Sequence, residues 1–259
     1  MTTKNITRKQ QLFTQLHYQE SPLLLGNVWD AHSAVIAQEA GFQALGTSSH
    51  AIAFSLGYKD GEEIPFDELL FMVERIMQVA TIPVSVDFES GYSEKPKKVA
   101  KKVRKLTELG VVGINLEDSQ VLNGKRQLQS PEVLVAKIEA IKDLTDIFIN
   151  ARTDTYTTKH PDPLKETCAR ANLYAKAGAD GIFVPLIESE KDLKIFLDEI
   201  KLPLNVFTTP HLPDYETLKT MGVHRISHGG KQYDQLMARS QELFKNFLSK
   251  KEYAIILGK

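Results

Sequence analysis

The sequence contains a single cysteine, Cys168, and no long apolar run. One cysteine excludes an internal disulfide framework and any metal site that needs several cysteines. No apolar stretch approaches the roughly 20 residues of a membrane-spanning helix, so we expect no membrane as a partner. The first residues, Met-Thr-Thr-Lys-Asn, lack the apolar core of a signal peptide. We therefore expect a cytoplasmic protein.

The chain also carries little net charge. Its 259 residues include 32 Lys and Arg and 33 Asp and Glu, which gives a formal net charge of −1. Proteins that bind nucleic acid or an anionic membrane surface usually present an excess of basic residues. We therefore expect neither of these partners. A hydrophobic content of 42% is ordinary for a globular protein with a buried core.

Short apolar runs alternate with helical patterns of roughly 10 to 15 residues along most of the chain. The alternation repeats about eight times and is typical of parallel strands joined by crossover helices. The predicted strands are 23–28, 44–48, 83–88, 113–118, 147–153, 181–186, 204–208 and 225–228.

Glycines precede several of these strands, at Gly41, Gly110, Gly178 and Gly222. Glycine is preferred just after a helix because it adopts the left-handed conformation without strain. Eight strand–helix units predict an α/β fold, a (β/α)8 barrel of the TIM type that forms one domain over residues 1–259. A doubly wound open sheet is the alternative, but its Gly-x-Gly-x-x-Gly motif does not occur.

The residues from Lys4 to Tyr18 predict an amphipathic helix ahead of the first strand, because apolar residues recur there among polar ones.

The stretch from Pro83 to Tyr92 combines a strand pattern with two carboxylates. Apolar and polar residues alternate with a period of two, so we expect Asp87 and Glu89 to point to the same side at the end of the strand. Two adjacent acids repel each other unless a cation or a shared proton lies between them. An edge strand with a solvated polar face is the alternative.

Polar residues at alternating positions also occur on the next two predicted strands, where they share one face of the strand. In a closed barrel such residues point into the interior or its mouth, and active sites of TIM barrels lie at the carboxyl ends of the strands. Clustered carboxylates without cysteine or a local pair of histidines favour Mg²⁺, or Mn²⁺, over zinc, with water completing the coordination. The predicted cluster consists of Ser85, Asp87, Glu89, Asn115, Glu117, Asn150, Arg152 and Asp154.

Arg152 is the one cation in this predicted cluster. Its guanidinium can bind a substrate carboxylate or phosphonate through two parallel hydrogen bonds. A metal ion beside it would polarise a neighbouring carbonyl group or stabilise an enolate. A buried ion pair with Asp154 or Glu117 is the alternative role.

The second strand ends in small residues that can bring backbone N–H groups close to an anionic oxygen. Ser48, Ser49 and His50 are therefore candidate substrate-binding residues, and Asp60 can join the outer shell of the metal. A helix cap at Ser48 or Ser49 is the alternative. Asn205 on the seventh strand can face the substrate or make a hydrogen bond inside the barrel.

Seven motifs in this order resemble the isocitrate lyase/phosphoenolpyruvate mutase superfamily, over nearly the whole chain from about Leu24 onward. The resemblance implies a Mg²⁺-dependent barrel that acts on small 2-oxo or 2-hydroxy carboxylates. Its members break or form C–C or P–C bonds through an enolate-like species. The motifs are Leu45-Gly-Thr-Ser-Ser-His50 with Leu56-Gly-Tyr-Lys-Asp60, Val86-Asp-Phe-Glu-Ser-Gly-Tyr92, Asn115-Leu-Glu-Asp118, Asn150-Ala-Arg-Thr-Asp154, Gly178-Ala-Asp-Gly-Ile-Phe-Val-Pro185, Pro203-Leu-Asn-Val206 and Gly222-Val-His-Arg-Ile-Ser227.

The resemblance also implies roles for matching residues. Asp87 corresponds to the direct metal ligand, and Arg152 corresponds to the clamp on the substrate carboxylate. Ser48 and Ser49 stand where the superfamily binds the carboxylate end of the substrate. Members commonly form tetramers in which the last helix packs on a neighbouring barrel, so a homotetramer or homodimer that exchanges the 231–249 helix is expected. The acids that correspond to those holding the waters of the metal are Asp60, Glu89 and Glu117.

Two departures from the superfamily pattern bear on the substrate. The isocitrate and methylisocitrate lyases carry Lys-[Lys/Arg]-Cys-Gly-His after the fourth strand, whereas residues 119–130 contain no cysteine, which argues against both activities. Asn123 and Lys125 are candidate catalytic counterparts of the loop in the phosphonate mutases, or else solvated loop residues. Pro185 stands where the mutases have a histidine.

The sequence therefore predicts a lyase that cleaves a C–C bond, with Arg152, Glu117, Asn123 and Lys125 as its candidate catalytic residues. A phosphonate mutase or hydrolase and a metabolite-binding barrel without catalytic activity are the alternatives.

Overall fold

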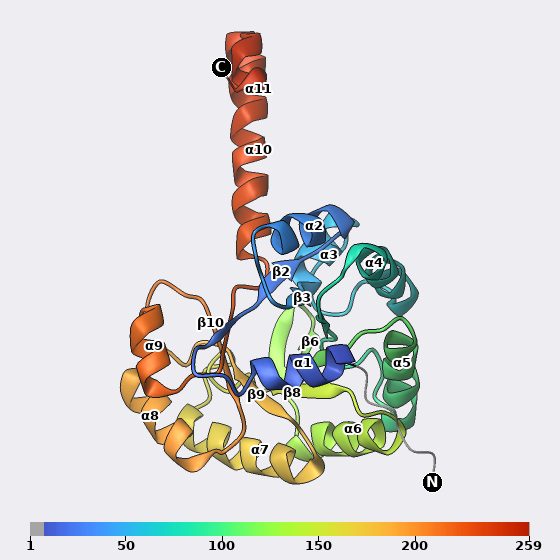
Figure 1. Cartoon of the computed structure of the whole chain (residues 1–259), viewed down its shortest axis with the longest axis vertical. Helices are drawn as coiled ribbons and strands as arrows, with labels where there is room; N and C mark the ends of the chain where they lie inside the picture. The colour runs from blue at the N-terminus through green and yellow to red at the C-terminus, as the bar shows by residue number, and fades with distance from the viewer. Residues whose placement is uncertain (1–7, 259) are drawn as a thin grey trace.

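A ring of parallel strands surrounded by helices makes up most of the computed structural model, which describes residues 8–258 (Figure 1). The strands are hydrogen-bonded in the order β1, β11, β10, β9, β8, β5, β4, β3, β2. Each predicted strand contains one of them, except that the first contains two. Their bounds are β1 Leu23–Leu24, β2 Gly26–Val28, β3 Leu45–Thr47, β4 Val84–Asp87, β5 Gly113–Glu117, β8 Phe148–Arg152, β9 Gly181–Val184, β10 Leu204–Phe207 and β11 Arg225–Ser227.

The ring closes through the first predicted strand, which the structure divides into β1 and β2. β1 pairs in parallel with β11, and β2 pairs in parallel with β3. Between them, the N–H of Leu25 donates to Ile226 O at 3.0 Å, and the N–H of Gly26 donates to Ala44 O at 3.2 Å. The continuous segment 23–28 thus pairs first with β11 and then with β3, which closes the ring. The predicted TIM-type (β/α)8 barrel is confirmed.

Helices connect successive strands and cover the outer face of the ring (Figure 1). The four glycines predicted at helix-to-strand turns all adopt positive φ, at 94° for Gly41, 94° for Gly110, 106° for Gly178 and 85° for Gly222. This confirms the predicted turns. The connecting helices are α2 Ala31–Glu39, α3 Ser49–Ser55, α4 Phe66–Val79, α5 Pro96–Glu108, α6 Pro131–Leu144, α7 Pro163–Ala177, α8 Glu190–Glu199 and α9 Tyr215–Met221.

The N-terminal helix α1 (Arg8–Leu16) packs against the amino ends of the strands. Its Phe13 is fully buried, and the ring of Phe13 lies 5.3 Å from that of Phe148 in an edge-to-face contact. A Cβ atom at Gly113 would lie 2.7 Å from Phe13, so only glycine leaves room for this ring. The helix predicted from Lys4 is confirmed from Arg8 onward, and residues 4–7 lie outside the described residues.

The C-terminal helix α10 (Lys231–Lys250) projects away from the barrel and is followed by the short α11 (Tyr253–Leu257) (Figure 1). Neither helix has a buried residue. Within residues 8–258, no helix combines the length and the apolar character needed to cross a bilayer. The exposed apolar residues of α10 and α11 are Leu236, Met237, Phe244, Leu248, Tyr253, Ile256 and Leu257.

An antiparallel hairpin follows β5 and was not predicted. It consists of β6 (Ser119–Leu122) and β7 (Lys125–Leu128). Asn123 and Gly124 form its tip with φ angles of 53° and 73°. Positive φ at both positions fits a tight two-residue turn, for which Asn-Gly is the preferred pair. The segment that corresponds to the catalytic loop of the lyases is therefore an ordered hairpin.

Candidate active site

Asp87, the last residue of β4, is oriented by hydrogen bonds from two neighbouring elements. The hydroxyl of Ser49 donates to Asp87 Oδ2 at 2.8 Å, and the backbone N–H of Ser49 lies 3.3 Å from the same oxygen. The N–H of Asp87 donates to Thr47 Oγ1 at 2.8 Å. In the described part of the chain, Oδ1 of Asp87 makes one long contact, 3.5 Å from Asn115 Nδ2. The carboxylate is thus held in place with one oxygen largely available.

The start of α3 brings the next predicted residues to this carboxylate. Ser48 caps the helix, because its side chain accepts a hydrogen bond from the N–H of Ala51. The hydroxyl of Ser49 also lies 3.3 Å from Asp60 Oδ1 and therefore lies between two acids. His50 turns toward α10, where its Nε2 lies 2.7 Å from Asp234 Oδ1. The predicted cap at Ser48 is confirmed, and Ser49 contacts the acids directly.

Glu89 lies two residues beyond Asp87 but outside the strand. Its side chain is 3% exposed, and Tyr92 donates a hydrogen bond of 2.8 Å to its Oε1. Oε2 is buried and has no hydrogen-bond partner among residues 8–258. Burial, and then the nearby carboxylates of Glu117 and Asp60, raise the pKa of Glu89 to about 9. A buried acid with an unsatisfied oxygen and acidic neighbours is suited to bind a cation.

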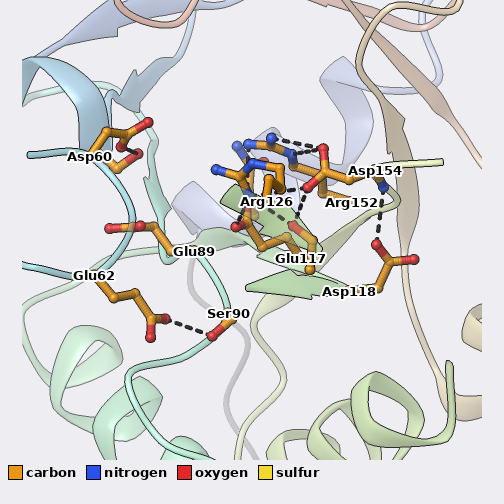
Figure 2. A network of polar contacts seen from close by, with 12 residues as sticks. Asp60, Glu62, Glu89, Ser90, Glu117, Asp118, Arg126, Arg152 and Asp154 are labelled. Atoms are coloured by element: carbon orange, nitrogen blue, oxygen red, sulfur yellow. Dashed lines mark hydrogen bonds and ion pairs between the residues drawn. The ribbon is translucent and has the colours of Figure 1, made fainter. Parts of the chain in front are cut away.

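The turn that carries Glu89 is strained. Glu89 and Tyr92 have φ angles of 47° and 57°, which side chains other than glycine rarely adopt. Glu62 holds this turn through its Oε1, which accepts from Ser90 Oγ at 2.9 Å and from the N–H of Tyr92 at 2.8 Å (Figure 2). Lys137 donates to Ser90 O at 2.6 Å from the other side. Strain maintained by surrounding contacts is common at functional sites.

These residues fit a hard divalent cation such as Mg²⁺. The donors are carboxylate oxygens, and the cation would satisfy Glu89 Oε2 and reduce the repulsion among the acids. Among residues 8–258, no three His, Cys, Asp or Glu side chains are grouped closely enough to hold a metal together.

Arg152, at the end of β8, lies between two buried carboxylates (Figure 2). Its Nη1 lies 3.0 Å from Glu117 Oε2, and its Nε and Nη2 donate to Asp154 Oδ1 at 2.9 and 2.8 Å. Burial raises the pKa of Asp154, but Arg152 and Arg126 together bring it below the ordinary value. The ion pairs foreseen as the alternative role of Arg152 are therefore both present in this structure.

Arg126 of β7 approaches the same two carboxylates from the hairpin (Figure 2). Its Nη1 contacts Glu117 Oε1, Ser119 Oγ at 2.7 Å and Asp154 Oδ2 at 3.2 Å. Sequence reasoning missed Arg126 and Ser119. The Asn-Gly pair at the hairpin tip was the available signal, because this pair predicts two antiparallel strands. In such a strand, Arg126 would point to the face opposite to that of Lys125 and Gln127.

Asp118 anchors the hairpin and the end of β8 to α7. Its Oδ1 accepts from the N–H of Asp154 at 3.0 Å, and its Oδ2 accepts from Arg170 at 3.0 Å and Tyr174 at 2.8 Å. Arg170 also donates to Gln129 O, at the base of the hairpin, at 3.0 Å. The second acid of the Asn-Leu-Glu-Asp motif is therefore structural.

A cavity of about 290 Å³ opens at the carboxyl ends of the strands. Asp60, Asp87 and the two arginines line it, whereas Glu89 and Glu117 line an adjacent cavity of about 340 Å³. The predicted acids therefore divide between two neighbouring cavities. The cavity of about 290 Å³ is called the main cavity. The residues that line it include Asn27, Thr47, Ser48, Ser49, His50, Asn115, Arg126, Arg152, Phe183, Pro185, Phe207, Ser227 and Lys231.

The sequence profile described as phosphoenolpyruvate phosphomutase matches residues 13–248, which is most of the chain. The chain belongs to the phosphoenolpyruvate phosphomutase family. The resemblance to the isocitrate lyase/phosphoenolpyruvate mutase superfamily is therefore confirmed.

Individual relatives agree with this family. An uncharacterised protein of Mycobacterium tuberculosis is 36% identical over 222 residues, which cover 85% of this chain and 83% of that protein. A 2-methylisocitrate lyase of Halalkalibacterium halodurans is 32% identical over 199 residues, 74% of this chain and 65% of that protein. The crystal structure of a putative phosphonomutase from Burkholderia cenocepacia has a TM-score of 0.87 and 38% identity, and the match covers 92% of this chain and all of that one.

Three predicted residues lie apart from the acids and arginines of this family member. Asn123 and Lys125 are exposed at the hairpin tip. Asn205 is buried and donates to Ser227 Oγ at 3.2 Å, which is the hydrogen bond inside the barrel that was its alternative role. The remaining predicted residues line the two neighbouring cavities, Glu89 and Glu117 one of them and Ser48, Ser49, His50, Asp60, Asp87 and Arg152 the other.

Proposed function

We propose that this protein is a Mg²⁺-dependent lyase that cleaves a C–C bond in a small 2-oxo or 2-hydroxy carboxylate through an enolate-like intermediate. The observation that carries the proposal is the position of Asp87, whose oriented carboxylate lines one cavity with Asp60 and two arginines. The named lyase and the putative phosphonomutase among its relatives are consistent with this class of chemistry.

The residues of the chain would divide the work as follows. Asp87 would bind Mg²⁺ directly, while Asp60, Glu89 and Glu117 would hold its waters. The bound ion would supply a Lewis acid that polarises a carbonyl group and stabilises the charge of an enolate. Arg152 would bind the substrate carboxylate after releasing part of its contacts with Glu117. Mn²⁺ is the expected substitute ion, because it shares the preference for oxygen ligands.

The chemistry of a phosphonate is the second candidate. The 38% identity to a putative phosphonomutase favours it, although Pro185 of the cavity wall cannot transfer a proton. The residues that border the main cavity include no cysteine, and His50 is the one histidine among those named for it. The third candidate is a barrel that binds metabolites without catalysing a reaction. It is supported by the absence of an evident proton donor among the residues that line this cavity.

We also propose that α10 assembles the protein with further copies of itself, as a homodimer or homotetramer. The apolar side chains of α10 and α11 are exposed, with Phe244 at 68% and Leu248 at 78%. A second copy could bury them, since large exposed apolar patches usually mark interfaces. The cytoplasmic location stays a prediction.

A substrate panel would test the proposed activity. Purified protein with Mg²⁺ would be incubated with 2-hydroxy diacids, oxaloacetate and phosphonopyruvate, and the products would be followed by ¹H and ³¹P NMR. We expect a C–C cleavage product that disappears in D87A. A product with a broken or migrated P–C bond would favour the second candidate, and binding without any product would favour the third.

A further inference from the structure

Arg126 reaches Glu117 and Asp154 from the hairpin formed by β6 and β7. Ser119, at the start of β6, also contacts Asp154. Within the hairpin, Val121 pairs with Arg126 and Leu122 pairs with Lys125. Lys125 and Gln127 are exposed, whereas Arg126 is half-buried, with 18% of its side chain accessible. The alternation of a strand therefore turns Arg126, and neither neighbour, toward the carboxylates.

A packing contact fixes the hairpin in this register. A Cβ atom at Gly61 would lie 2.7 Å from the side chain of Val121, which indicates that Val121 packs directly on the backbone of this glycine. At the other end, Gln129 N–H donates to Asp118 O at 2.8 Å. Arg126 is thus held over the site by contacts on both sides of its strand.

The carboxylates next to Arg126 are shared with Arg152. Arg152 alone contacts both Glu117 and Asp154, at distances of 2.8 to 3.0 Å. Arg126 adds a second guanidinium to the same pair of acids (Figure 2). Two guanidinium groups match two carboxylates in number, so any donors that Arg126 has left over can serve an anionic group of a ligand.

Arg126 also keeps donors available. Its contacts with Glu117, Ser119 and Asp154 all use Nη1. Within residues 8–258, Nε and Nη2 of Arg126 make no hydrogen bond to another described residue. A guanidinium has five N–H donors, so three remain for a ligand in the cavity that Arg126 lines.

We propose that Arg126 determines substrate specificity by binding a second anionic group, a carboxylate or a phosphonate, on a substrate whose first carboxylate is bound by Arg152. This inference rests on the proposed function and adds to it the residue that recognises the second anionic group. The two guanidinium groups share Glu117 and Asp154, so they lie close enough to bind both ends of a short molecule. A cavity of about 290 Å³ suits a substrate of three or four carbon atoms.

Three related acids can test this assignment. Pyruvate has one anionic group, oxaloacetate adds a carboxylate at C3, and 3-phosphonopyruvate adds a phosphonate at the same carbon. Their dissociation constants would be measured by isothermal titration calorimetry in the presence of Mn²⁺. The variants are R126Q and R126K, and R104Q is the matched control because Arg104 is exposed on α5, where it pairs with Glu108.

We expect R126Q to weaken binding of oxaloacetate or 3-phosphonopyruvate by roughly 10- to 100-fold and binding of pyruvate by less than about threefold. R126K should retain part of the affinity because it keeps the charge, and R104Q should match the wild type. The dianion that loses more affinity identifies the anionic group. Circular dichroism of each variant would confirm that it is folded.

An equal loss for all three acids, or no loss for either dianion, would overturn the role of Arg126. The proposed function is judged separately on the wild type, which should bind pyruvate in a metal-dependent manner that D87A abolishes. If the wild type binds pyruvate in this way but R126Q does not discriminate, only the specificity assignment fails. If the wild type binds none of the three acids, both proposals fail.

Discussion

The hydroxyl group of Ser49 and the carboxylate of Asp87 are joined by a hydrogen bond of 2.8 Å between the start of α3 and the end of β4. This contact orients Asp87, because it holds Oδ2 while Oδ1 makes a single long contact, to Asn115, among residues 8–258. Ligands that are fixed by neighbouring hydrogen bonds bind metals more tightly than mobile ones.

Metal affinity should therefore respond to both residues, but to different extents. We expect D87A to abolish Mn²⁺ binding in an electron paramagnetic resonance titration, and S49A to weaken it by roughly 10-fold, the lower end of effects seen for supporting hydrogen bonds. D198N is the control, since Asp198 pairs with Lys194 on the exposed face of α8. Unchanged Mn²⁺ affinity in D87A would contradict the proposed site.

Replacing Arg152 should destabilise the fold in a pH-dependent manner. R152M leaves Glu117 and Asp154 with Arg126 as their remaining cation, and we expect a loss of about 3 kcal/mol in the free energy of unfolding at pH 8. Burial raises the pKa of Glu117 to about 7 even in the intact protein. Its protonated form is therefore favoured in the folded state, and this contribution to stability is lost as the pH rises through 7.

The loss in R152M should accordingly be smaller at pH 5 than at pH 8. Urea denaturation at both values would measure it, with R75M as a control because Arg75 pairs with Glu74 on an exposed helix face. A loss that is the same at both pH values would argue against Glu117 as the source.

His17 should make the protein sensitive to acid. It follows α1, its ring stacks on that of Phe148 at 4.3 Å, and its Nδ1 lies 2.7 Å from Phe13 O. Burial, and then the charge of Arg225, lower the pKa of His17 to about 3. The unfolded chain binds a proton near pH 6.5 and the folded protein does not, so stability falls as the pH drops from 6.5 toward 3.

The expected slope from His17 is about 1.4 kcal/mol per pH unit in this range. H17F keeps an aromatic ring but cannot be protonated, so its unfolding free energy should fall less steeply between pH 6.5 and pH 5 than that of the wild type. H32F is the control, because His32 is exposed on α2. Parallel curves for H17F and the wild type would show that His17 does not contribute.

Two glycines with positive φ allow the hairpin contact to be measured. Gly61 and Gly57 have φ angles of 107° and 83°, but only a Cβ at Gly61 would collide with Val121. G57A should cost about 1 kcal/mol through backbone strain, and G61A should cost roughly 1 to 3 kcal/mol more through overpacking. Chemical denaturation measures both. Equal losses would mean that Val121 moves aside without cost.

Assembly through α10 can be tested with a charge on its apolar face. We expect F244E to shift the protein to a smaller assembly in size-exclusion chromatography with light scattering, since a charge buried in an interface is costly. K245E changes the charge of the next residue of the same helix and serves as control. An unchanged mass for F244E would remove α10 from the interface.

Much of the site could be predicted from the sequence because strand parity and barrel topology act together. Glu117 and Arg152 occupy paired positions of β5 and β8, so their contact follows from the register of adjacent parallel strands. Glu89 also lies near Glu117, but strand geometry does not account for its position. β4 ends at Asp87, and the strained turn that follows carries Glu89 into the adjacent cavity. Parity predicts side-chain direction only while the chain remains a strand.

Arg126 shows the other limit of sequence reasoning. The Asn-Gly pair predicts a hairpin, but nothing local says that the hairpin lies over β5 and β8. Its position depends on Gly61 and on Asp118, which come from other parts of the chain. The division of residues 23–28 into two strands likewise depends on neighbours at both sides.

The bond between His50 and Asp234 links the cavity to the base of α10, where Lys231 also lies over the ring of Phe207. α10 projects from its own barrel (Figure 1), and neither α10 nor α11 has a buried residue. A contact that orders the far end of α10 would therefore come from another molecule. If α10 packs on another copy of the chain, as proposed, that contact would also stabilise the cavity wall at His50 and Lys231. Substrate affinity should then rise with protein concentration, in step with subunit association, and dilution alone would weaken it.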